Sequence, residues 1–201
     1  MSPARSVRTP SEDALRRRVK GELRRRMKAL RGALPAERRE ARAADAAKQA
    51  LASGAFDAVA NGATIGSYIA IRGELDPEPL ENALRERGIA VAYPRVDEDS
   101  VVFHRCLRSE LVDGPMGLFE PPSSAEVATL NALIVPALAL DPRGHRVGYG
   151  MGFYDRVLAE LTATRIGYAY DFQLVPETPN EAHDVALDWL VTDARHLRAE
   201  A

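Results

Sequence analysis

The residues with the clearest chemical potential lie between Gly148 and Arg156. Glycines stand at positions 148, 150 and 152, between an apolar run and a stretch with helical character. Glycine lets backbone amides approach an anion closely, and the N-terminus of a helix adds a favourable dipole. The segment lacks a following Gly-Lys-Ser/Thr, and its third glycine comes one position too early for a dinucleotide fingerprint. It is typical of a phosphate-binding loop, and a tight strand-to-helix turn is the alternative interpretation.

Charged residues beside this loop suit phosphoryl transfer. Asp155 is placed where its carboxylate could hold Mg²⁺, a cation that prefers oxygen ligands and shares them with phosphates. Arg146 and Arg156 flank the loop and could neutralise the charge that develops during transfer. Taken singly, Asp155 also fits a helix-start carboxylate, and Arg156 fits a solvated helix residue.

Two N-terminal helices precede the part of the chain that carries the loop. Thr9, Pro10 and Glu12 are typical of a helix start, and Gly32 is a plausible stop. Pro35 opens a second, alanine-rich helix that ends near Gly54. The first helix carries one apolar stripe at helical spacing, formed by Leu15, Val19, Leu23, Met27 and Leu30.

The rest of the chain alternates between strand-like and helix-like segments. This alternation predicts an α/β fold, with a mainly parallel sheet that has helices on both faces. Residues 132–140 are almost continuously apolar, as expected of a central buried strand, whereas residues 107–130 read mostly as loop. Further strands are expected at 64–71, 89–93, 101–106, 165–170 and 188–192, and helices at 76–87 and 153–161.

Composition is that of a globular protein. The 201 residues are 46% hydrophobic and 28% charged, with one cysteine and no apolar run near the ~20 residues of a membrane span. We expect a cytoplasmic protein with a partly disordered N-terminal extension at 1–17 and a single domain at 18–201. Basic residues gather in the first 48 positions and acidic ones in the remainder, so the basic segment could bind a nucleic acid, an anionic small molecule or the acidic body of the protein itself.

The chain carries the segments KGELR at 20–24, GELD at 73–76, YPR at 93–95, GLFEP at 117–121, PALALD at 136–141, RVGYG at 146–150, GFYDR at 152–156, GYAYDFQ at 167–173 and PNEAHD at 179–184. Together, and in this order, they resemble the 5-formyltetrahydrofolate cyclo-ligases, also called methenyltetrahydrofolate synthetases. The resemblance covers about residues 18–193. Leu140 and Phe153 depart from the phenylalanine and tyrosine usual in the family, and both changes preserve apolar or aromatic character.

The resemblance implies a role for each matched residue. Lys20 and Arg24 would contact ATP phosphates, Glu74 would bind the pterin of the folate, and Tyr154 would lie near the folate. Asp155 and Asp184 would hold Mg²⁺, and Lys20, Arg146 and Arg156 would assist the chemistry. Tyr93 and Arg95 are left open, and His183 is expected to be structural. The loop that would cradle ATP comprises Arg146, Gly148, Tyr149, Gly150, Met151, Gly152, Phe153 and Tyr154.

The family's reaction converts 5-formyltetrahydrofolate and ATP into 5,10-methenyltetrahydrofolate, ADP and phosphate. Such a reaction needs positioning and electrostatic stabilisation rather than a covalent nucleophile. We therefore expect an Mg²⁺-dependent enzyme. We also expect it to act as a monomer, without nucleic-acid or membrane partners. Two other functions are weighed against it. One is a different ATP- or phosphosugar-using enzyme on a related fold. The other is a nucleic-acid binder built on the arginine-rich first helix, against which the 6% aromatic content counts.

Overall fold

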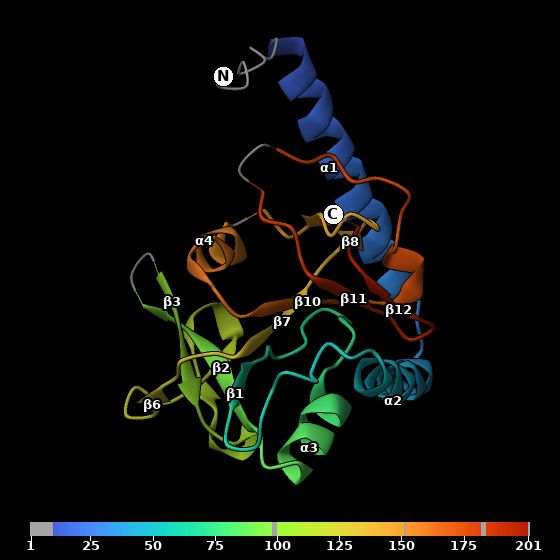
Figure 1. Cartoon of the computed structure of the whole chain (residues 1–201). Coiled ribbons are helices and arrows are strands. Elements are labelled where there is room, and N and C mark those ends of the chain that lie inside the picture. Colours follow the sequence, from blue (N-terminus) through green and yellow to red (C-terminus); the bar gives the residue numbers. More distant parts are fainter. Residues whose placement is uncertain (1–9, 98–99, 151, 182–183, 201) are drawn as a thin grey trace, which may run out of the picture.

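The protein is built around one mixed sheet flanked by helices (Figure 1). The computed structural model describes residues 10–97, 100–150, 152–181 and 184–200. Five neighbouring strands pair in parallel at the centre, and antiparallel strands close both edges, so the expected mainly parallel sheet is confirmed. In sheet order the strands are β12 (His196–Arg198), β11 (Trp189–Val191), β10 (Thr164–Tyr168), β7 (Ala132–Pro136), β1 (Thr64–Gly66), β2 (Ala90–Asp97), β3 (Ser100–Arg105) and β6 (Glu126–Val127).

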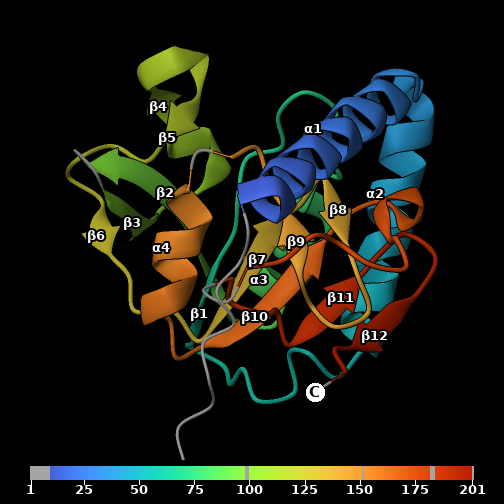
Figure 2. The ribbon, with the colours of Figure 1, turned by 90° about the horizontal axis from the view of Figure 1, so that it is seen from above.

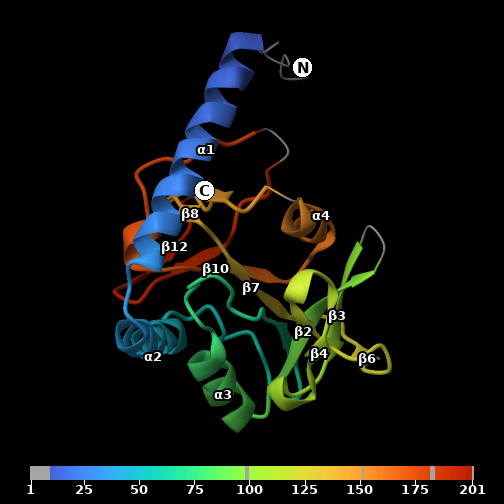
Figure 3. The same ribbon diagram turned by 180° about the vertical axis from the view of Figure 1, so that it is seen from behind.

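Helices cover both faces of this sheet, as the alternating sequence predicts. Helices α2 (Ala36–Ala52) and α3 (Glu78–Glu86) pack on one face, while α1 (Pro10–Gly32) and α4 (Phe153–Glu160) lie on the other. From behind, α4 stands beside the β2–β3 hairpin and α1 stands at the opposite end (Figure 3). Helices α1 and α4 therefore lie on the same face of the sheet, at different ends of it (Figure 1, Figure 3).

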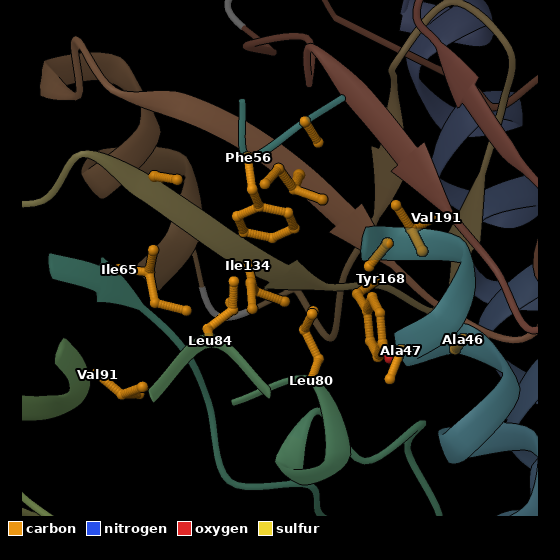
Figure 4. Close-up of a cluster of buried hydrophobic side chains, with 14 of the residues drawn as sticks. Ala46, Ala47, Phe56, Ile65, Leu80, Leu84, Val91, Ile134, Tyr168 and Val191 are labelled. Carbon is orange, nitrogen blue, oxygen red and sulfur yellow. The ribbon is translucent and has the colours of Figure 1, made fainter. Parts of the chain in front are cut away.

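The two-residue period of the central strand separates two cores. Ala132 and Ile134 of β7 belong to the cluster shared with α2 and α3, whereas Leu133 and Val135 belong to the cluster under α4. Alternate side chains of a strand point to opposite faces, so a continuously apolar strand must be covered twice. Figure 4 shows the first cluster, in which Leu80 and Leu84 of α3 meet Ile65, Val91, Ile134 and Tyr168.

Helix α1 buries only part of its apolar stripe, since Met27 is 4% exposed while most of the other stripe residues are not covered. Leu15 is 60% exposed and Val19 39%, whereas the side chain of Lys20 is only 16% exposed. Seen from above, α1 lies against the hairpin of β8 (Ala139–Leu140) and β9 (Arg146–Val147) (Figure 2). The predicted stripe forms on the helix, but polar contacts decide which face is covered.

Two predicted strands are wrong in length. The segment 132–140 divides into β7 and β8, because the side-chain amide of Gln173 donates to the carbonyls of Ala137 (2.8 Å) and Leu138 (2.9 Å) where the chain leaves the sheet. The segment 64–71 pairs only as far as Gly66, and its second half turns away. A side chain that satisfies main-chain carbonyls lets a buried strand end early.

Short elements fill the region predicted as loop. They are η1 (Arg108–Glu110), β4 (Val112–Asp113), η2 (Pro115–Gly117), β5 (Phe119–Glu120) and β6, with η3 (Asp171–Gln173) further along. The edge strand β12 is an addition that the sequence pattern does not predict. Helix α1 runs without a break across the expected boundary between residues 17 and 18. No helix in the described part of the chain has the length and apolar character needed to cross a membrane.

Candidate active site

A cavity of about 300 Å³ is lined by residues of α1 and α4 and by residues that follow the carboxyl ends of the central strands. After β1 the chain returns to the sheet as β2, on one side of β1, whereas after β7 it returns as β10, on the opposite side of β7. The direction in which successive strands are added therefore reverses between β1 and β7. Ligands of open parallel sheets bind at such a reversal. The loops that leave β1 and β7, at 67–74 and 136–150, both contribute to the cavity wall.

Most of the predicted site residues meet in this cavity although they are far apart in the sequence. Arg156 is an exception, because its side chain is exposed and stacks over the ring of Phe153, 5.6 Å from the ring centroid. Met151 lies outside the described residues. The predicted residues that line the cavity are Lys20, Arg24, Glu74, Arg146, Gly148, Tyr149, Gly150, Gly152, Phe153, Tyr154, Asp155 and Asp184.

One wall of the cavity is cationic and comes from α1. Lys20 Nζ lies 3.3 Å from Glu181 Oε1 and 3.5 Å from Asp184 Oδ2. Arg24 Nε donates to the carbonyl of Gly148 at 2.8 Å, which joins α1 to the glycine-rich loop. Both basic side chains are therefore held at the cavity, on the covered face of the helix.

The glycine-rich loop adopts a backbone that requires glycine. Gly150 has a φ of +93°, and a Cβ atom there would lie 3.1 Å from Arg24 Nη2. Positive φ is disfavoured for residues with a Cβ, so both the backbone and the close approach of Arg24 depend on the missing side chain. Gly152 precedes α4 in the left-handed conformation. The loop thus leads into the N-terminus of a helix, as a phosphate-binding segment requires.

Two carboxylates of the cavity wall suit a cation shared with phosphates. Asp155 is paired with Arg146 across the loop, and Asp184 is paired with Lys20. Among residues 10–97, 100–150, 152–181 and 184–200, no three His, Cys, Asp or Glu side chains are arranged to hold a metal ion. Mg²⁺ usually takes one or two protein carboxylates and completes its shell with water and substrate phosphates. Asp155 and Asp184 fit that pattern.

Glu74 forms the buried end of the cavity. Its carboxylate accepts a hydrogen bond from the amide of Ile71 at 3.0 Å and lies 3.6 Å from the guanidinium of Arg31. Burial raises the pKa of Glu74, while the Ile71 amide, Arg31 and Tyr149 act in the opposite direction. Such a carboxylate can accept hydrogen bonds from a ligand with neighbouring N–H groups.

The remaining wall is largely apolar and was not predicted. Val96 and Val101 of the β2–β3 hairpin face it, as does Phe119, which is 54% exposed. Tyr68, two residues after β1, also lines the cavity, and burial raises its pKa well above the ordinary value. Single apolar residues carry no sequence signal for a site, because scattered exposed apolar residues are common.

Tyr93 and Arg95, whose roles the sequence leaves open, are not among the residues that line the cavity. Tyr93 is fully buried, and its hydroxyl donates to Glu81 Oε2 at 2.6 Å. Arg95 pairs with Glu120 at 2.8 Å and donates to the carbonyl of Pro121. These contacts tie β2 to α3 and to the loop before β6. His183 lies outside the described residues.

Comparison with known proteins identifies relatives of this chain. The 5-formyltetrahydrofolate cyclo-ligase of Mycolicibacterium smegmatis is 34% identical over 151 residues, which are 69% of this chain and 78% of that protein. The 5-formyltetrahydrofolate cyclo-ligase of Escherichia coli K12 is 32% identical over 143 residues, covering 66% of this chain and 79% of its own length.

Solved structures share the fold. The Aquifex aeolicus 5,10-methenyltetrahydrofolate synthetase superposes with a TM-score of 0.79 at 27% identity, over 91% of this chain and 94% of that one. The Mycoplasma pneumoniae 5,10-methenyltetrahydrofolate synthetase has a TM-score of 0.69 at 23% identity, over 87% and 98%. The sequence profile that describes the 5-formyltetrahydrofolate cyclo-ligase family matches residues 16–193, and the chain belongs to that family.

Proposed function

We propose that this protein uses Mg-ATP to convert 5-formyltetrahydrofolate into 5,10-methenyltetrahydrofolate, releasing ADP and phosphate. The observation that carries the proposal is that one cavity has two chemically different sides. Basic residues of α1 and a glycine-rich loop form one side, and a buried carboxylate with apolar neighbours forms the other. The first side suits a triphosphate, and the second suits a flat heterocycle with N–H donors.

The polyphosphate of ATP would lie against Lys20, Arg24 and the loop at 148–152. These basic groups are already held by Asp184 and Gly148, so little conformational freedom is lost when the nucleotide binds. Bound Mg²⁺ would neutralise phosphate charge during transfer, held by Asp155 and Asp184. Arg146, which pairs with Asp155 and lies over the ring of Tyr154, would supply further positive charge beside the transferred group.

The folate would place its pterin N–H groups on Glu74 and its ring beside Tyr154. Its formyl oxygen then attacks the γ-phosphorus, the bond to the ADP oxygen breaks, and the formyl carbon becomes an iminium bearing a phosphate. Nitrogen N10 attacks this carbon, and the carbon–oxygen bond breaks. The phosphate leaves with the former formyl oxygen and the N10 proton, which balances the overall reaction.

In this scheme the protein supplies position and charge rather than a nucleophile. The formyl oxygen is a poor leaving group until it is phosphorylated, so the two steps must share one water-poor cavity. The half-buried basic residues and the apolar wall of Val96, Val101 and Phe119 suit that demand.

A spectroscopic assay for methenyltetrahydrofolate tests the proposal directly. Purified protein is mixed with 5-formyltetrahydrofolate, ATP and Mg²⁺, with reactions lacking one component as controls. Formation of the methenyl product, with equimolar ADP and only in the complete mixture, is expected. ATP turnover without the methenyl product would assign the cavity to another phosphoryl acceptor, and tight ligand binding without ATP turnover would refute an enzymatic role.

A further inference from the structure

Arg31, near the end of α1, is a fully buried arginine that the scheme above does not use. A buried guanidinium is costly unless its charge and its five N–H donors are satisfied. Arg31 Nη2 donates to the carbonyl of Arg72 at 3.2 Å and to the hydroxyl of Tyr149. Within the described residues, Arg31 Nε and Nη1 have no hydrogen-bond partner. A group buried at this cost and only partly satisfied calls for a functional explanation.

The charge of Arg31 faces Glu74. Their side chains are 0% and 5% exposed, and Nη1 lies 3.6 Å from Glu74 Oε1, slightly beyond hydrogen-bond distance. A modest movement of the carboxylate would close this gap. Because little solvent screens the pair, the attraction is stronger than that of a surface ion pair.

The backbone that carries Glu74 is tightly built around this contact. Glu74 N donates to the carbonyl of Ile71, and Arg72 adopts a φ of +50°, which is unusual for a residue with a side chain. A Cβ at Gly73, whose φ is +74°, would lie 3.4 Å from the carbonyl of Arg31. The turn at 71–74 is thus fitted to the end of α1 by both backbone and side-chain contacts.

Tyr149 joins the same group from the glycine-rich loop. Its hydroxyl accepts from Arg31, and the guanidinium carbon of Arg31 lies 5.6 Å from the ring centroid. Lys28 and Arg72 also lie within 6 Å of this ring, at 5.1 and 5.8 Å. Arg31 therefore touches both the candidate pterin-binding turn and the candidate phosphate loop.

We propose that Arg31 is a positioning residue that holds Glu74 charged and oriented for the substrate, and that links it to Tyr149 of the glycine-rich loop. This inference rests on the proposed function, because binding of the pterin N–H groups is the reason for a charged carboxylate at this depth. The ionisable groups that face Glu74 are Arg31 from α1, Tyr149 from the loop, Tyr68 after β1 and Tyr154 from α4. Of these, Arg31 is the positive charge that opposes the effect of burial on the pKa of Glu74.

Two substitutions at position 31 separate charge from geometry. Arg31→Met removes both, whereas Arg31→Lys keeps the charge but loses the planar fork that reaches Arg72 and Tyr149. The exposed Arg26→Met on the same helix is the matched control. Tyr149→Phe removes the hydroxyl that joins Arg31 to the loop, and it tests the link if Arg31→Met does not fold.

The primary measurement is the pH dependence of kcat/KM for 5-formyltetrahydrofolate at saturating Mg-ATP. The acid limb of this pH profile should move to higher pH by about one unit in Arg31→Met. A nearby opposite charge lowers a carboxyl pKa by about 1–3 units, so its removal lets the pKa of Glu74 rise. Arg31→Lys should keep the limb near its wild-type position and raise the KM for folate several-fold more than the KM for ATP. Tyr149→Phe should also raise the KM for folate. Arg26→Met should match wild type.

A direct titration distinguishes failure of this inference from failure of the proposed function. The ¹³C resonance of the Glu74 carboxyl, assigned by its loss in Glu74→Gln, is followed with pH in the ligand-free protein. If the wild type makes no methenyl product but the resonance titrates higher in Arg31→Met, the function fails and the electrostatic role stands. Coincident titrations in wild type and Arg31→Met would overturn the role of Arg31, as would coincident acid limbs with an unchanged KM for folate.

Discussion

Replacing Glu74 by glutamine should weaken folate binding without weakening the fold. Glutamine keeps the size of the side chain but turns one acceptor into a donor, which would face the N–H groups of the pterin. Charge-assisted hydrogen bonds contribute about 1.5–3 kcal/mol. Since ~1.4 kcal/mol is a factor of ten, the Kd for 5-formyltetrahydrofolate should rise about ten- to hundredfold.

The same substitution should not lower the free energy of unfolding of the ligand-free protein at pH 7. Burial is the largest influence on Glu74 and raises its pKa, even with Arg31 and the Ile71 amide acting against it. The folded pKa therefore lies above the unfolded value of about 4.3. The stabilisation from this group is complete below the unfolded pKa and is lost as pH rises through the folded pKa. The wild type therefore loses this stabilisation as pH rises, whereas Glu74→Gln has no titrating group at this position and does not lose it.

The melting temperature therefore gives an internal control for the binding experiment. At pH 7, Glu74→Gln should have a Tm equal to or above that of wild type, and the difference should shrink toward pH 4. Calorimetric titrations with folate and with a non-hydrolysable ATP analogue complete the test. A large loss of Tm at pH 7 would refute the electrostatic reasoning. Unchanged folate affinity would place the pterin elsewhere, and equal losses for both ligands would indicate misfolding.

Further predictions concern the nucleotide end of the cavity. Asp155→Asn should keep its Tm, because that side chain is 52% exposed, but should lose most ATP-dependent turnover; near-normal activity with unchanged Mg²⁺ dependence would contradict a role as metal ligand. Lys20→Ala should raise the KM for ATP or lower kcat while removal of residues 1–14 changes little, and two silent variants would leave Lys20 only its ion pairs with Glu181 and Asp184. Gly150→Ala should weaken ATP binding about tenfold or more, because a Cβ atom is strained at a φ of +93° and would crowd Arg24. Titration with the nucleotide analogue measures this loss of affinity. Chelation of Mg²⁺ should abolish turnover without lowering the Tm, and full activity in excess chelator would exclude a required divalent cation.

The sequence indicates the fold class because the relevant signals are local. Proline and glycine mark the limits of α2, and the apolar run at 132–136 identifies the central strand. Strand and helix periods differ, so their alternation is visible without any tertiary contact. Loop signals are also local, and the conformations of Gly150 and Gly152 are those expected of a tight loop before a helix.

Strand ends and edge pairing depend on partners that are distant in sequence. The break after β7 requires Gln173, which reaches back from a segment more than thirty residues later. Strand β12 is short and pairs only with β11, at the edge of the sheet. No periodicity within three residues can distinguish such a strand from loop.

The orientation of α1 shows most clearly what only the tertiary structure decided. Leu15 and Val19 of its apolar stripe are exposed, while Met27 of the same stripe and the charged Arg31 are buried. The covered face is chosen by partners that the helix meets only after folding, among them Gly148, Asp184 and Glu74.

By itself, the sequence determined the kinds of elements, their order and the residues that match one enzyme family. The tertiary structure alone brought a helix near the N-terminus, the turn after β1 and the loop after β7 to one cavity at the reversal of strand order. It also placed Arg31 between Glu74 and Tyr149, which no motif predicts. The physical reason is that local patterns report backbone preference and amphipathicity, whereas the balance between desolvation and pairing of a charge depends on groups from distant parts of the chain.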